Sequence, residues 1–157
     1  MKNLFGQIKK NNSQGLSATY HIGLLQTRAF KAIMGQTSEL LSKLDITNVD
    51  WVALGIIYDH NMGLRSTVLA RTLGIEQAYI TVLTAKLNKR GLLTVSSDPT
   101  DKRAKIIHIS KKGKSFVKQT EAMLSKEMGK ISVGISTQDA DAYLRVLQAI
   151  VDSTEKK

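Results

Sequence analysis

Residues 73–110, LGIEQAYITVLTAKLNKRGLLTVSSDPTDKRAKIIHIS, decide the fold predicted for this chain of 157 residues. Apolar residues recur at helical spacing as far as Leu92, and Gly91 marks the end of that helix. Two runs rich in β-branched residues, 92–97 and 104–110, then flank a polar turn. The stretch therefore predicts a helix followed by a β-hairpin with a basic tip.

The positive charge of the chain is concentrated in the same region. Residues 82–118 hold ten Lys or Arg residues against two acids, a net charge of +8, whereas the whole chain carries +10. The remainder of the chain is close to neutral. A helix followed by a hairpin, with the charge focused there, is typical of a module that binds DNA.

Composition excludes several classes of site. The chain has no cysteine, which excludes disulfides and thiolate metal sites, and its three histidines have no partner carboxylate at metal-ligand spacing. We find no catalytic constellation and no phosphate-binding glycine loop. We therefore expect no metal, no cofactor and no enzymatic activity. The absence of a signal peptide and of a long apolar run predicts a cytoplasmic protein with no membrane partner.

Upstream of the deciding stretch, the pattern predicts an arm and three helices. Residues 1–15 are polar and rich in turn formers, which indicates a flexible N-terminal arm. Apolar residues at three- and four-residue spacing predict a long amphipathic helix within 16–45. Thr47 and Asp50 are placed to form a capping box that opens the next helix. A short helix then follows over 66–73.

Gly74 suits the left-handed position that ends the short helix. With the helix predicted over 76–90, this makes two helices separated by a tight turn, the helix-turn-helix arrangement. After the hairpin, helical periodicity resumes over 111–130, and residues 136–139 are placed to cap a final helix. The predicted fold is mostly α with a small β component (α+β): a winged helix-turn-helix with additional helices at both ends. The outer helices are too apolar to remain exposed and require a partner.

Three motifs resemble the MarR (multiple antibiotic resistance regulator) family, and among its members the SlyA-like branch is the nearest. They are LA-x-x-LGI-EQ at 69–77, L-x-K-R-GL at 87–92 and DPTDKRAK at 98–105. The similarity extends from about Thr47 to Gly113 and includes Trp51 in the capped helix. The wing motif is highly specific when it follows such a helix pair.

The resemblance implies a homodimeric transcription regulator that binds double-stranded DNA. Residues 46–110 would form the winged helix-turn-helix DNA-binding domain, and residues 16–45 and 111–157 the helical dimerisation region. The two recognition helices of the dimer would lie ~34 Å apart, about one turn of the duplex, on a pseudo-palindromic operator. Such regulators often respond to a small aromatic or anionic effector, which would change the separation of the two helices.

The recognition helix would be 76–90 and the wing 98–105. Amides on the first turns can pair with adenine, and methyl groups can meet the thymine methyl. Arg103 suits the narrow minor groove of A·T-rich DNA, and Asp101 would orient the turn or Arg103 itself. The residues predicted for DNA binding are Gln77, Ala78, Tyr79, Thr81, Val82, Lys86, Asp101, Lys102, Arg103 and Lys105.

Several residues of this set allow more than one interpretation. Lys86, Lys102 and Lys105, and Lys89 beside them, are either phosphate contacts or part of a solvated basic face. Val82 stands where relatives often carry Arg, so the sequence preference is expected to differ. Three further residues, Tyr20, His21 and Trp51, are candidates for an effector site, although aromatic residues at helical spacing are more often core. The alternative function is a winged-helix protein-interaction module whose basic face binds acidic partners.

Overall fold

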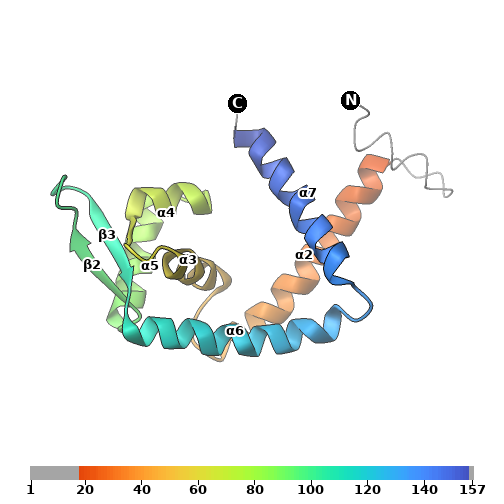
Figure 1. Cartoon of the computed structure of the whole chain (residues 1–157), viewed down its shortest axis with the longest axis horizontal. Coiled ribbons are helices and arrows are strands. Elements are labelled where there is room, and N and C mark those ends of the chain that lie inside the picture. Colours follow the sequence, from red (N-terminus) through yellow and green to blue (C-terminus); the bar gives the residue numbers. More distant parts are fainter. Residues whose placement is uncertain (1–17, 156–157) are drawn as a thin grey trace. The chain divides into compact units, whose positions relative to one another are not determined.

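We describe residues 18–155 of a computed structural model of the chain, shown in Figure 1. The chain divides into two compact units, Met1–Leu124 and Ser125–Lys157. The predicted arm 1–15 and the first two residues of the 16–45 segment lie outside the described residues. The helices and strands are α2 (Ala18–Ser42), α3 (Asn48–Asp59), β1 (Leu64–Arg65), α4 (Ser66–Leu73), α5 (Gln77–Lys89), β2 (Leu93–Ser97), β3 (Lys105–Ile109), α6 (Lys111–Ile131) and α7 (Thr137–Glu155).

The helix boundaries follow from capping groups that the sequence predicted. Thr47 and Asp50 form the expected capping box at the start of α3, where each side chain accepts a hydrogen bond from the other's backbone N–H. Gly74 ends α4 with a φ of 65°, the left-handed conformation that glycine adopts without a steric cost. Ser136 and Asp139 form the corresponding bonds before α7. The predicted helix-turn-helix is confirmed as α4 and α5.

The sheet has one more strand than the sequence predicted. The hairpin of β2 and β3 is present, and its tip projects beyond α4 and α5 (Figure 1). A third strand, β1, pairs antiparallel with β3, so the order in the sheet is β1-β3-β2. The prediction missed β1 because two residues are too few to show the alternation of a strand. The fold is otherwise the predicted one, mostly helical with a small antiparallel sheet.

The core of the first unit lies among the helix-turn-helix, the sheet and the ends of the neighbouring helices. Most of its fully buried side chains come from α3, α4, α5 and the hairpin, among them Leu54, Leu69, Ile80, Leu87 and Ile107. Val117 and Leu124 extend this core along α6. Because α5 packs one face into this core, its opposite face is left exposed.

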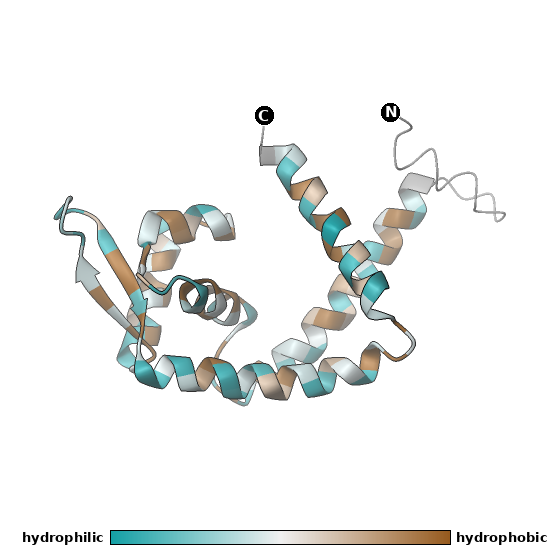
Figure 2. Ribbon diagram, viewed as in Figure 1, coloured by the Kyte–Doolittle hydropathy of each residue, from teal (hydrophilic) through white to brown (hydrophobic). Residues whose placement is uncertain are grey.

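The second unit contains the end of α6 and the whole of α7. Apolar side chains of α7 remain exposed, including Tyr143, Leu144 and Ile150. Figure 2 shows apolar positions interleaved with polar ones along α7, and the same is seen along α2 in the first unit. Among the residues described, no helix has the length and apolarity needed to cross a membrane.

Candidate nucleic-acid interface

A groove between α5 and the wing brings together four of the predicted DNA-binding residues. Gln77 and Thr81 line it from the helix, and Arg103 and Lys105 line it from the hairpin. Its volume is about 430 Å³. The prediction placed these residues on two separate elements, and the structure shows that they share one surface.

The exposed face of α5 carries the remaining predicted residues of the recognition helix. Ala78 is exposed, Tyr79 is 48% exposed and Val82 is 67% exposed. Thr81 donates its hydroxyl hydrogen to the carbonyl oxygen of Gln77 at 3.1 Å. Because the opposite face of the helix is held in the core, these side chains are directed away from the domain.

The wing is held at its base by Asp98, for which the wing motif 98–105 predicted no individual role. The Asp98 side chain is 4% exposed. Its Oδ1 accepts hydrogen bonds from the Thr100 hydroxyl at 2.6 Å and from the Thr100 N–H at 2.8 Å. Its Oδ2 accepts from Arg65 Nε, also at 2.6 Å. Hydrogen bonds from Thr100, together with Arg65, hold the pKa of Asp98 well below its ordinary value.

Arg65 therefore connects the wing to β1. It also donates from Nη2 to the Thr100 hydroxyl at 3.1 Å, so both ends of the guanidinium contact the turn. This pairing could not be predicted, because Arg65 and Asp98 lie 33 residues apart in the chain. The only local signal was an Asp at the start of a turn, where its side chain commonly accepts from backbone N–H groups.

The tip of the wing is ordered by a second carboxylate. Asp101 accepts a hydrogen bond from the Arg103 N–H at 3.0 Å, and its carbonyl oxygen accepts from the Ala104 N–H at 2.9 Å. This is the turn-orienting role that the sequence predicted for Asp101. The side chains of Lys102 and Arg103 are exposed at this tip. Lys105 donates to the Ser97 hydroxyl at 3.2 Å across the hairpin.

Lys86, a predicted DNA-binding residue, forms an ion pair within the fold. Its Nζ lies 2.7 Å from Oδ2 of Asp50, the residue that completes the α3 capping box. Burial raises the pKa of Asp50, but the hydrogen bonds from Lys86 and Thr47 outweigh it, so the pKa lies below its ordinary value. Lys86 therefore joins α5 to the start of α3.

Arg90 makes a second connection one turn further along. Its guanidinium donates to the carbonyl oxygens of Leu44 at 2.8 Å and Asp45 at 2.6 Å, just beyond the end of α2. It also lies over the Phe116 ring of α6, 5.7 Å from the ring centre. Arg90 was missed as a functional residue, because the chain positions that it joins are 45 and 46 residues away.

The three candidate effector residues do not lie together within the described part of the chain. Tyr20 and His21 lie near the start of the described part of α2, whereas Trp51 lies in the first turns of α3. Thr37, which contacts Asn48 at the start of α3, is 17 residues beyond Tyr20, or about 25 Å along the helix at 1.5 Å per residue. Trp51 is half-buried and packs against the core.

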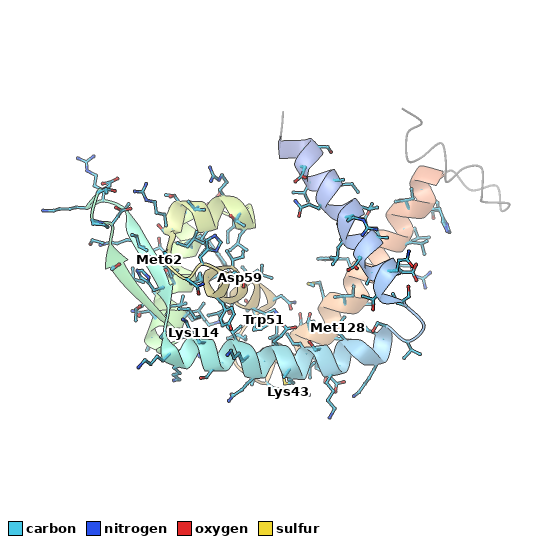
Figure 3. The ribbon with its side chains drawn as sticks, viewed as in Figure 1. Lys43, Trp51, Asp59, Met62, Lys114 and Met128 are labelled. Atoms are coloured by element: carbon cyan, nitrogen blue, oxygen red, sulfur yellow. The ribbon has the colours of Figure 1, made fainter. Side chains whose placement is uncertain are left out.

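A polar cavity lies between the end of α3 and the start of α6. It has a volume of about 320 Å³ and is lined by Tyr58, Asp59, Asn61 and Lys114. Figure 3 labels Asp59 and Lys114 at this place, with Trp51 on α3. Within the described residues, no group of His, Asp or Glu side chains is arranged to hold a metal ion.

Comparison with known proteins relates this geometry to one family. Residues 46–105, which span the helix-turn-helix and the wing, match the sequence model of the MarR family. A MarR family transcriptional regulator from Rhodococcus sp. RHA1 superposes with a TM-score of 0.77 and 24% identity over 88% of this chain and 96% of the other.

Two further solved structures are similar. CouR from Rhodococcus jostii RHA1, bound to p-coumaroyl-CoA, gives a TM-score of 0.74 and 22% identity over 82% of this chain and 90% of the other. The Staphylococcus aureus MepR–DNA complex gives 0.69 and 20% identity over 83% of this chain and 96% of the other. At these identities the superpositions establish the fold.

Proposed function

We propose that this chain is a homodimeric transcription regulator of the MarR type that binds a pseudo-palindromic operator through α5 and the wing. The observation that carries the proposal is the groove in which Gln77, Thr81, Arg103 and Lys105 converge. The side-chain amide of Gln77 on the helix suits a base edge, and the two cations on the adjoining hairpin suit the phosphate backbone beside it.

The cations divide into two groups in this proposal. Lys86 and Arg90 hold α5 against the α2–α3 region and are assigned to the fold. Lys102 and Arg103 are exposed at the wing tip and are assigned to DNA, with Arg103 entering the minor groove. Asp101 acts on DNA only indirectly, because its carboxylate fixes the backbone N–H of Arg103.

Dimerisation is supported by the apolar faces of the outer helices. On α2, Tyr20 and Phe30 are 60% and 62% exposed. On α7, Leu144 is 62% exposed, and Tyr143 and Val151 are exposed on the same helix. Apolar surface of this extent is stabilised when a second copy covers it. We assign α2, the C-terminal part of α6 and α7 to the dimer interface.

The proposed regulator responds to a small ligand. The superposed CouR structure holds p-coumaroyl-CoA. Tyr20 and His21 remain candidates for a ligand site in this chain, but the length of α2 separates them from Trp51 of the same protomer. Such a site would therefore have to be completed by other elements.

The proposal is tested by fluorescence anisotropy on DNA from beside the gene, with competitor DNA at physiological salt. We expect sequence-selective binding by a dimer, weakened at least tenfold by Arg103→Ala. Lys43→Ala is the matched control, because it removes an exposed cation that pairs with Glu39 on α2, outside the groove. Weak binding that is blind to sequence and unaffected by Arg103→Ala would instead favour a protein-interaction module.

A further inference from the structure

The exposed face of α5 carries a stripe of methyl groups. Ala78, Thr81, Val82 and Ala85 are all exposed, and their spacing of three, four and seven residues places them on one side of the helix. The side chain of Val82 has an exposed fraction of 67%. We refer to these four residues as the methyl stripe.

The methyl stripe offers almost no hydrogen-bond donor. Three of its members are hydrocarbon side chains, and the hydroxyl of Thr81 donates to the Gln77 carbonyl oxygen within the helix. The first cation along α5, Lys86, is paired with Asp50. The stripe therefore lacks the bidentate Arg or Lys contact by which a recognition helix most often identifies guanine.

Cations border the methyl stripe on the side of the wing. Thr81 and Ala85 line the same groove as Arg103 and Lys105. An apolar surface beside positive charge fits a partner that is polyanionic and yet presents apolar groups. In the major groove, the group that meets this description is the 5-methyl of thymine.

We propose that the methyl stripe makes thymine methyl groups the main specificity determinant of each half-site, with Val82 as the central contact. This inference rests on the proposed function and specifies what that DNA surface recognises. Each methyl covered by the stripe contributes a factor of about four in affinity. One such contact in each half-site contributes roughly fifteenfold.

The test begins with selection of binding sites by the full-length protein from a pool of random-sequence duplexes. The selected duplex is then resynthesised with deoxyuridine in place of thymidine, which removes the 5-methyl and keeps the pairing edges. We expect a loss of roughly fifteenfold in affinity. A third duplex with 5-bromodeoxyuridine, whose bromine is close to a methyl in size, should restore binding.

Two variants connect this effect to the proposed residues. Val82→Ala should weaken binding to the thymidine duplex by about fourfold per protomer and to the deoxyuridine duplex much less. Arg103→Ala should weaken binding to both duplexes by the same factor, because its proposed contact lies in the other groove. Both positions are exposed, and thermal melting serves as the check that the variants remain folded.

The outcomes separate the two proposals. If selection enriches no DNA sequence, or if the protein binds acidic proteins and no DNA, the regulator function and the inference both fail. If a sequence is enriched and deoxyuridine leaves its affinity unchanged, the function stands and the inference is wrong. Equal losses for Val82→Ala on both duplexes would also overturn it.

Discussion

Gly113 lies where α6 closely approaches the backbone of Leu92, the residue just before β2. A Cβ atom added at this glycine would lie 2.1 Å from the carbonyl oxygen of Leu92 and 2.7 Å from Cδ1 of Ile109. Carbon–oxygen contacts in proteins are ordinarily about 3.3 Å or longer, so Gly113→Ala requires the two segments to separate by about 1 Å. The same Leu92 oxygen accepts the Ser110 N–H at 3.0 Å, and that bond would be strained.

The cost of Gly113→Ala is estimated from these contacts. Overpacking of this kind costs about 1–3 kcal/mol, and a weakened hydrogen bond adds about 1 kcal/mol. Alanine returns less than about 1 kcal/mol, because the site is in the first turn of α6. We expect a net destabilisation of about 2 kcal/mol, which lowers Tm by roughly 6 °C in a chain of this length.

Differential scanning calorimetry at one fixed protein concentration measures this change, since association makes Tm depend on concentration. Gly55→Ala is the matched control. It lies inside α3, and an added Cβ there meets nothing within 4 Å. The control should gain about 0.5–1 kcal/mol. A Tm for Gly113→Ala equal to or above that of the original protein would refute the steric argument.

Three further predictions concern charged side chains. The pKa values of Asp50 and Asp98 are lower in the folded state than the value of about 3.9 expected in the unfolded chain, so both carboxylates stabilise the fold fully above that pH. The urea midpoint should therefore stay level from neutral pH to about pH 5 and fall in stronger acid. In Asp98→Asn the fall should be shallower, because only Asp50 still contributes to it. Lys102→Gln should reduce the log–log salt slope of DNA binding by about 0.9 per protomer, whereas Lys86→Gln should lower Tm and leave that slope unchanged. Arg90→Lys should lower the unfolding free energy by about 1 kcal/mol because an ammonium does not reproduce the fork that bonds two carbonyl oxygens, and an unchanged urea midpoint would contradict this.

The features that could be predicted from the sequence are those whose partners lie within a few residues. The Thr47–Asp50 capping box and the left-handed Gly74 depend on local backbone geometry, and both are present. Asp101 was expected to orient the turn or Arg103 itself, and its bond from the Arg103 N–H, which spans two residues, is consistent with that expectation. Contacts between residues that are close together in the chain can be predicted from the sequence alone.

The features that could not be predicted depend on segments far apart in the chain. Lys86 reads as one more surface cation until α3 brings Asp50 to it, 36 residues away. Arg65 and Asp98 likewise meet only when β1 joins β3. Net charge could therefore locate the basic region but could not separate the cations that hold the fold from those that are exposed.

The ion pair of Lys86 and the hydrogen bonds of Arg90 affect how the exposed residues of α5 could change in evolution. They secure α5 from its inner side, on residues that take no part in the exposed stripe. The residues at positions such as 78 and 82 can therefore be substituted while α5 keeps its packing against the rest of the fold. Duplicated copies of the gene could acquire new DNA targets by substitution of single surface residues. In protein design, a different set of exposed side chains could be placed on α5 without changing how the helix packs.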